Sequence, residues 1–185
     1  MEKYDYLHKP DTELMNGILE LLFKSFPVNE CRPVDTLLSM LSWPTFSIYI
    51  EREQGRVAAL MFSHDVGGMR FIENFCVSPE LRNSGRGGHM LDEFIAMDEK
   101  PVVLEVEPPK DTLTCRRVGF YKRHGLVLDE RKYIMPPLGA GLEPLRLYLM
   151  SSKPLGNDFE RVRDGIYRLA YRVEPAEVER LAVSC

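Results

Sequence analysis

The sequence lacks several features that mark particular classes of protein. Its four cysteines include no Cys-x-x-Cys pair, and its four histidines show no metal-ligand spacing with them, so we expect no metal site. No apolar run approaches the roughly 20 residues that span a bilayer. The acidic start of the chain, residues 1–14, has no apolar core of the kind found in signal peptides. The sequence therefore predicts no membrane partner and a cytoplasmic location.

A basic surface is also missing. The chain has 24 Lys and Arg against 28 Asp and Glu, a formal net charge of -4. Because neutralising nucleic-acid phosphates needs clustered positive charge, this balance disfavours a nucleic-acid partner. The 185 residues contain 44% hydrophobic residues, with charges of both signs interspersed. This composition is typical of a folded domain with a sizeable core.

The hydrophobic pattern divides the chain into two parts. The first predicts a short strand at 3–8, a helix at 11–26, a short helix at 34–41, and strands at 45–50, 57–62 and 69–77. Tight turns between those three strands predict an antiparallel meander. The second part alternates helix and strand, at 87–97, 102–106, 111–124, 145–150 and 157–181. We therefore expect an α+β (α/β) fold with one mixed sheet.

A glycine-rich loop joins the strand at 69–77 to the helix that follows it. Gly85, Gly87 and Gly88 fall within four residues. Glycine lets backbone N–H groups approach an anion closely, and a helix N-terminus adds unpaired N–H donors. Arg82 and Arg86 add positive charge, so the segment suits a pyrophosphate; the alternative is a plain structural turn.

Two common nucleotide motifs do not fit this loop. A P-loop needs Lys followed by Ser or Thr after its glycines, and neither pair is present. A dinucleotide-binding loop needs Gly-x-Gly-x-x-Gly, but Met90 stands at the position of the last glycine.

The spacing Arg82-x-x-Gly85-x-Gly87, just after a strand ending Val77-Ser78-Pro79, resembles the signature loop of the GNAT acetyltransferases. The resemblance implies a mostly antiparallel central sheet of about 6–7 strands flanked by helices, with acetyl-CoA as co-substrate and no metal. The coenzyme-binding residues that it implies are Phe75, Cys76, Val77, Arg82, Asn83, Ser84, Gly85, Arg86, Gly87 and Gly88.

A second segment, 114–126, supports this resemblance. It is similar to a later helix of the family, which commonly ends in Tyr, three residues and Gly-Phe; here Tyr121 and Gly125 match, and Leu126 replaces the Phe. The strand at 104–106 reads Leu-Glu-Val, as in some ribosomal-protein N-terminal acetyltransferases. Thr114 stands near a position where the family often has Asn. The matching segments cover about residues 46–150, so we expect a GNAT domain at 1–153 and a helical extension at 154–185.

The resemblance implies an N-acetyltransferase in which an amine attacks the acetyl thioester directly. Tyr121 is the candidate acid for the leaving thiolate, with a packed core tyrosine as the alternative. Glu73 and Glu105 are the candidate bases. We expect Glu73 to share a strand face with Phe71, Phe75 and Val77. A structural pair with an arginine, an acceptor-binding role and proton removal through water are the alternatives.

Other roles follow from the same segments. Backbone N–H groups at 75–77, where the family's strand bulges, are the expected oxyanion donors. Cys76 and Cys115 have no nearby His and carboxylate in sequence, so covalent catalysis is disfavoured. The apolar segment 133–141 is interpreted either as a loop beside the acceptor or as an ordinary connection.

Two functions compete with acetyl transfer to an amine: a non-catalytic acyl-CoA-binding domain, and an acyltransferase with a longer acyl donor. The expected acceptor is a small-molecule amine or a peptide. The C-terminal extension packs on the domain or mediates dimerisation, and both a monomer and a homodimer remain open.

Overall fold

The computed structural model describes residues 1–5 and 7–181. In that part of the chain, seven strands form one mixed sheet in the order β1-β2-β3-β4-β5-β7-β6. Only the β4–β5 pair is parallel. The strands are β1 (Glu2–Asp5), β2 (Phe46–Glu53), β3 (Arg56–Asp65), β4 (Arg70–Val77), β5 (Val102–Val106), β6 (Val127–Met135) and β7 (Leu145–Ser151).

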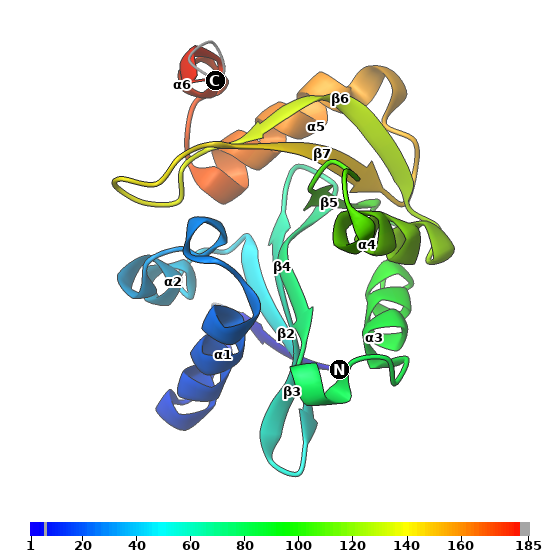
Figure 1. The fold of residues 1–185 in the computed structure, drawn as a ribbon. Helices are drawn as coiled ribbons and strands as arrows, with labels where there is room; N and C mark the ends of the chain where they lie inside the picture. The colour runs from blue at the N-terminus through cyan, green and yellow to red at the C-terminus, as the bar shows by residue number, and fades with distance from the viewer. Residues whose placement is uncertain (6, 182–185) are drawn as a thin grey trace.

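Helices cover both faces of the sheet (Figure 1). One face carries α1 (Thr12–Ser25), α2 (Val34–Met40) and α5 (Phe159–Ile166), whose apolar residues pack in two buried clusters with β2–β7. The other face carries α3 (Arg86–Ile95) and α4 (Thr112–Arg123), which pack in a third cluster. The predicted α+β fold with a mostly antiparallel sheet is therefore confirmed.

A bulge in β4 sets the direction of the side chains that follow it. Phe62 of β3 lies opposite Asn74 and Ser63 lies opposite Ile72, so Glu73 is an extra residue without a partner in the register. Phe75 and Val77 consequently pack on the α3–α4 face. Glu73 shares a face with Phe71, as expected, since His64 contacts both residues. The expectation that Phe75 and Val77 share that face is wrong, because the inserted residue reverses the alternation. The bulge expected at 75–77 occurs at Glu73 instead.

Strands β4 and β5 separate after a short paired stretch. Their register covers only Arg70–Ile72 against Val102–Leu104, although both strands continue further. The backbone beyond Ile72 and Leu104 therefore borders an opening in the middle of the sheet.

Strand β6 was missed by the sequence analysis. The charged run at 129–132 interrupts any alternating pattern, and the pairing of β6 with β7 is irregular between Asp129 and Tyr133. The apolar segment 133–141, interpreted as a loop, begins with the last three residues of β6.

The C-terminal segment packs on the sheet. Phe159, Val162 and Ile166 of α5 are buried beside Val103 of β5 and Leu149 of β7. A π-helical segment, Tyr167–Tyr171, and α6 (Pro175–Leu181) follow. None of the helices in the described residues is long and apolar enough to cross a bilayer. The last four residues of the predicted extension lie outside the described part of the chain.

Candidate active site

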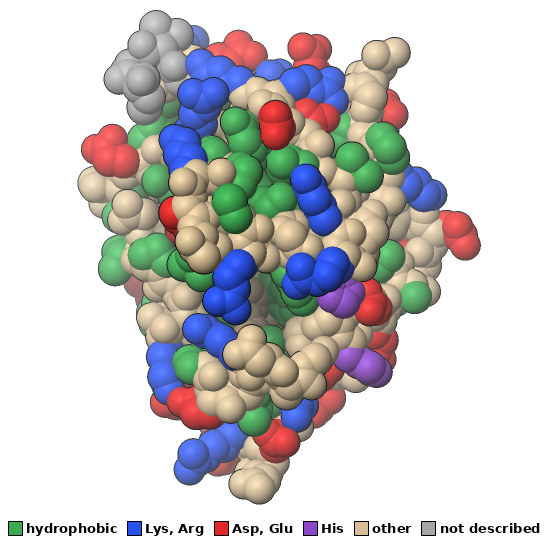
Figure 2. Space-filling view, turned by 45° about the vertical axis from the view of Figure 1, so that its right-hand side comes forward, with side chains coloured by type: hydrophobic (Ala, Val, Ile, Leu, Met, Phe, Trp, Pro, Cys, Tyr) green, Lys and Arg blue, Asp and Glu red, His purple; other side chains and the backbone are tan. Residues whose placement is uncertain are grey.

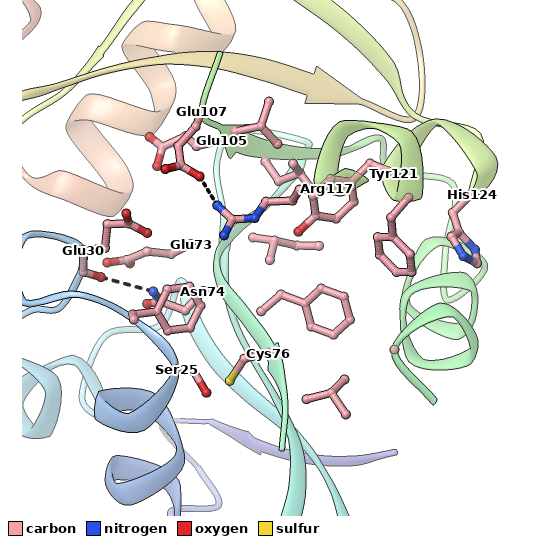
Figure 3. A pocket seen from close by; sticks show the side chains of 18 of the residues that line it. Ser25, Glu30, Glu73, Asn74, Cys76, Glu105, Glu107, Arg117, Tyr121 and His124 are labelled. Carbon is pink, nitrogen blue, oxygen red and sulfur yellow. Dashed lines mark hydrogen bonds and ion pairs between the residues drawn. The ribbon is translucent and has the colours of Figure 1, made fainter. Parts of the chain in front are cut away.

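A cavity of about 940 Å³ lies where β4 and β5 separate (Figure 3). It is lined by the second half of β4, the end of β5, the glycine-rich loop, α4, and Tyr171 from the C-terminal segment. Among the predicted site residues, those that line it are Glu73, Phe75, Cys76, Val77, Arg82, Asn83, Gly85, Gly87, Gly88, Glu105 and Tyr121. The fold thus brings most of the predicted site residues to one cavity.

The loop between β4 and α3 has the backbone of an anion site. Asn83 and Gly85 both have left-handed conformations, with φ of 64° and 83°. The first intrahelical bond of α3 runs from the His89 N–H to the Gly85 carbonyl. The N–H groups of the first turn, at 86–88, therefore have no partner within the helix and no side-chain cap. Such a turn is suited to bind an anionic group.

The side chains of Arg86 and Ser84, two of the predicted coenzyme-binding residues, bind other residues of the chain. The Arg86 guanidinium binds Glu51 and Glu53 of β2, each at 3.1 Å. The Ser84 hydroxyl donates to the Leu81 carbonyl at 2.7 Å. Neither residue lines the cavity, so only their backbone can serve a ligand there. Arg82 does line it, and its Nε donates to the Val77 carbonyl at 3.3 Å.

At alternate residues of β4, the backbone N–H and C=O groups point toward the opening between β4 and β5. The Ser78 N–H donates to Ala58 of β3, whereas the Val77 carbonyl accepts from Arg82. Because N–H directions alternate along a strand, the N–H groups of Val77 and Phe75 point away from β3. These groups face the side from which β5 has separated, where an extended ligand can pair with them.

Glu73 lies in a buried charge network on the opposite face. Its carboxylate accepts from Arg32 Nε at 2.5 Å and contacts His64 Nε2 at 2.7 Å, and only 3% of its side chain is exposed. Burial raises its pKa, but the charge of Arg32 and the bond to His64 outweigh burial and hold the pKa at about 2. Glu73 is therefore a permanent anion at neutral pH. Its contacts are those of a structural ion pair with an arginine, which was one of the alternatives drawn from the sequence.

Glu105 is bonded to two tyrosines, and no cation among the described residues is bonded to it. Tyr171 donates its hydroxyl to the two carboxylate oxygens at 2.9 and 2.7 Å, and Tyr133 donates to Oε1. Loss of hydration raises the pKa of Glu105 to about 8, although both tyrosine hydroxyls stabilise its anion. A carboxyl group with such a pKa can take up and release a proton near neutral pH.

Tyr121 lines the cavity from α4 (Figure 3), and its hydroxyl makes no hydrogen bond to any described residue. Burial raises its pKa to about 12, so the phenol keeps its proton.

Cys76 lines the same cavity, and burial raises the pKa of its thiol to about 11. A thiol so rarely ionised is a poor nucleophile, which agrees with the expectation against covalent catalysis.

Three residues that shape this site were given no role of their own from the sequence: Arg32, Tyr171, and Tyr133, which was placed only in the segment 133–141. Arg32 lies 41 residues from Glu73, and Tyr171 lies 66 residues from Glu105. No local pattern marks such contacts. The only available signal was the position of Glu73 and Glu105 on interior strands, where a carboxylate needs partners.

A small group of possible ligand atoms lies on the surface, formed by Glu51, His89 and Glu93. The three atoms lie within 4.8 Å of one another. Glu51 already binds Arg86, and His89 and Glu93 are exposed. Glu93 is paired with the N-terminal ammonium, so both carboxylates of the group already have cationic partners.

Comparison with solved structures identifies the family. A GNAT-family protein from Bacteroides thetaiotaomicron, described as an acetyltransferase, is 30% identical and superposes with a TM-score of 0.82 over 89% of this chain and 95% of its own. The chain therefore belongs to the GNAT family, and its fold is one that carries acyl transfer from acyl-CoA. No family model and no curated protein matches the sequence.

More distant structures share the fold. The ribosomal-protein-S18-alanine N-acetyltransferase of Escherichia coli is 14% identical, with a TM-score of 0.54 over 81% of this chain and 91% of its own. A GNAT acetyltransferase from Elizabethkingia anophelis with acetyl-CoA bound is 15% identical, with a TM-score of 0.54 over 74% and 90%.

Proposed function

We propose that this protein is an acetyl-CoA-dependent N-acetyltransferase that moves an acetyl group to an amine of a small molecule or peptide. One observation carries the proposal. A single cavity contains an anion-binding loop, the unpaired edge of β4, a protonated phenol and a carboxyl group with a pKa near neutrality. These are the groups that transfer of an acyl group from a coenzyme A thioester to an amine requires.

The donor would bind along β4 and the loop. The pyrophosphate suits the free N–H groups at 86–88, with the Arg82 guanidinium beside them. The amide groups of the pantetheine arm suit the N–H groups of Phe75 and Val77. Those N–H groups also offer the oxyanion a donor, and such a donor typically contributes about 10²–10³ in rate.

Glu105 is the proposed base. In the reaction the amine nitrogen bonds to the acetyl carbon, the carbon–sulfur bond breaks, and the nitrogen loses a proton. A carboxylate with a pKa of about 8 accepts that proton more readily than an ordinary carboxylate. Glu73 is unsuited, because its pKa of about 2 makes it a very weak base.

Tyr121 is the proposed donor to the leaving sulfur. Its hydroxyl is free of other partners among the described residues and keeps its proton at neutral pH. A phenol with a pKa of about 12 is a weaker acid than a thiol. Tyr121 therefore stabilises the thiolate by a hydrogen bond and keeps its own proton. The sulfur takes a proton from water as the product leaves, and Glu105 releases the amine's proton to water.

Acidic residues at the other end of the cavity favour a cationic acceptor. Glu30 and Glu107 line the cavity near Glu105, and Arg117 is bonded to Glu107. Burial raises the pKa of Glu30, and the negative charge of Glu107 adds to the rise. The negative charges of Glu30 and Glu107 repel each other. A positively charged group on the acceptor, apart from the amine that reacts, would relieve this repulsion by binding between them.

An assay of acetyl-CoA with a panel of amines tests this proposal. The panel contains a polyamine, amino acid amides and peptides with free N-termini, and the readouts are free thiol and the mass of the acetylated product. We expect amine-dependent thiol release that the Glu105→Gln variant reduces by about 100-fold or more. Tight binding of acetyl-CoA without acetylation of any amine would favour the non-catalytic alternative.

A further inference from the structure

We propose that the acceptor carries an apolar group next to its reacting amine and no carboxylate. The N-terminus of a peptide with a bulky apolar first residue meets this description, and so does a branched alkylamine. The inference rests on the proposed function and names the substrate class of the same site. Three apolar residues of the cavity lining carry it, Met135, Leu138 and Leu147. We call them the apolar wall.

The apolar wall begins beside the carboxyl group of Glu105. Leu149 of β7 lies opposite Glu105, and Tyr133 of β6 lies opposite Leu147. Residues that lie opposite each other, or two apart on one strand, share a face of the sheet. Met135 and Leu147 therefore point to the same face as Glu105, and Tyr133 between them donates its hydroxyl to that carboxylate. An amine that reaches Glu105 has the apolar wall next to it.

The apolar wall is held firmly by its neighbours. Met135, Leu138 and Leu147 belong to one buried cluster, in which they pack with residues of α5. Phe26, at the end of α1, also lines the cavity and is partly exposed. A substituent that leaves water for such a fixed apolar surface gains about 4-fold in binding for each CH₂ group buried. The wall can therefore select amines that bear an aliphatic or aromatic group.

The charges near Glu105 disfavour a carboxylate on the acceptor. Glu30 and Glu107 line the cavity together with Glu105, and Arg117 is already paired with Glu107. A further carboxylate would be repelled by these groups and would hold Glu105 in its protonated form, which cannot accept the amine's proton. A free amino acid has a carboxylate on the carbon next to its amine, whereas a peptide N-terminus and an alkylamine have none there.

Other positive side chains of the cavity belong to the donor side. Figure 2 shows Lys and Arg side chains gathered around a hollow with apolar side chains at its base. Arg82 follows β4 in the loop at 82–88, Arg123 ends α4, and both line the cavity. A carboxylate on the acceptor would have to compete with the phosphates of the donor for these two guanidinium groups.

Acetylation of two matched pairs of amines tests the inference. The pairs are leucine amide with glycine amide, and 3-methylbutylamine with methylamine, and kcat/KM is measured from thiol release and product mass. The apolar member of the preferred pair should exceed its partner by at least about 10-fold, the lower end of what one methylene contributes in an apolar pocket. The pair that is acetylated faster shows whether the acceptor is a peptide N-terminus or an alkylamine.

A variant of the wall and a matched control make the test specific. Leu138→Ala should reduce the preference for leucine amide over glycine amide by about 4-fold or more, the factor for one CH₂ group. Leu142 lies in the same loop between β6 and β7 and packs against the same cluster, but it does not line the cavity. Leu142→Ala should therefore keep the preference. A ratio between two substrates does not depend on how much of a variant folds.

Glu30→Gln tests the exclusion of a carboxylate. The wild type should acetylate leucine amide faster than free leucine, and the variant should narrow this gap because it removes one of the repelling charges. The amide also has the less basic amine, which favours it equally in both proteins. The change in the ratio between the two proteins therefore reports the effect of Glu30.

The outcomes separate the two proposals. If the apolar member of each pair is acetylated no faster than its partner, or if Leu138→Ala keeps the full preference, the apolar wall does not select the acceptor, while the proposed function stands. An unchanged gap in Glu30→Gln would overturn the exclusion of a carboxylate. If none of these amines and no amine of the wider panel is acetylated, the proposed function fails and this inference fails with it.

Discussion

The hydroxyl of Tyr171 donates to both carboxylate oxygens of Glu105, at 2.9 and 2.7 Å. Tyr171 belongs to the C-terminal π-helical segment, and Arg32 lies over its ring, 5.1 Å from the centroid. Arg32 in turn binds Glu73. The two candidate bases are therefore connected through a residue of the C-terminal extension, and the extension takes part in building the site.

Replacing Tyr171 with Phe should shift the pH dependence of the reaction. The two hydrogen bonds stabilise the anion of Glu105, so their loss raises its pKa above the present value of about 8. Because the base must be deprotonated, the rising limb of kcat/KM against pH should move to higher pH. Tyr167→Phe is the matched control, since that hydroxyl bonds to the backbone of Ile134 instead. An unchanged limb in Tyr171→Phe would contradict the role of Glu105.

The two glutamates should have opposite effects on stability against pH. The folded-state pKa of Glu73 is depressed to about 2, so its contribution is present above pH 4.5 and is lost as the pH falls toward 2. The folded-state pKa of Glu105 is raised to about 8, so stability falls as the pH rises from 4.5 to 8. Denaturant unfolding of Glu105→Gln should show a weaker decline over that second range. A decline equal to that of the wild type would exclude the raised pKa.

Glu73→Gln should mainly destabilise the fold. It leaves Arg32 as a buried charge without its partner, which typically costs about 3–5 kcal/mol. Thermal unfolding at pH 7 measures this loss. Glu105→Gln keeps acceptors for both tyrosines and should leave the melting temperature near that of the wild type. Equal melting temperatures for the two variants would contradict the distinct roles given to these carboxylates.

Tyr121→Phe should lower kcat without lowering stability. Its hydroxyl has no bond to a described residue that the change would break, and one hydrogen-bond donor to a developing anion typically contributes about 10²–10³-fold. Steady-state kinetics should show an unchanged KM for acetyl-CoA. A rate equal to that of the wild type would leave Tyr121 as a packing residue.

Gly88 should be sensitive to any side chain. A Cβ at this position would lie 2.6 and 2.8 Å from atoms of the His124 ring, which is held by Asp92 at 2.6 Å. Gly88→Ala must therefore displace either the ring or the first turn of α3, and we expect weaker binding of acetyl-CoA. Adding His124→Ala removes the clash and should recover most of the affinity. Failure to recover would show that the alanine acts in another way.

Site residues could be predicted from the sequence where a short motif marks them, and not where their role depends on a contact with a distant part of the chain. The loop at 82–88 and Tyr121 were found because glycine spacing and a helix motif are contained in short segments. The bulge at Glu73 was misplaced, since no residue type there demands one and only the pairing with β3 reveals it. Strand β6 was hidden by its charged middle. Tyr171 could not be assigned, because its partner Glu105 lies 66 residues away.

The most direct test of the account is isothermal titration of acetyl-CoA against the wild type and Gly87→Glu. A Cβ at Gly87 would lie 3.1 Å from the Val77 side chain, so a glutamate projects into the donor site and adds negative charge beside the phosphates. The account predicts micromolar binding to the wild type and its loss in the variant while the fold persists by circular dichroism. No binding to the wild type, or equal binding to both, would contradict a donor site at this loop.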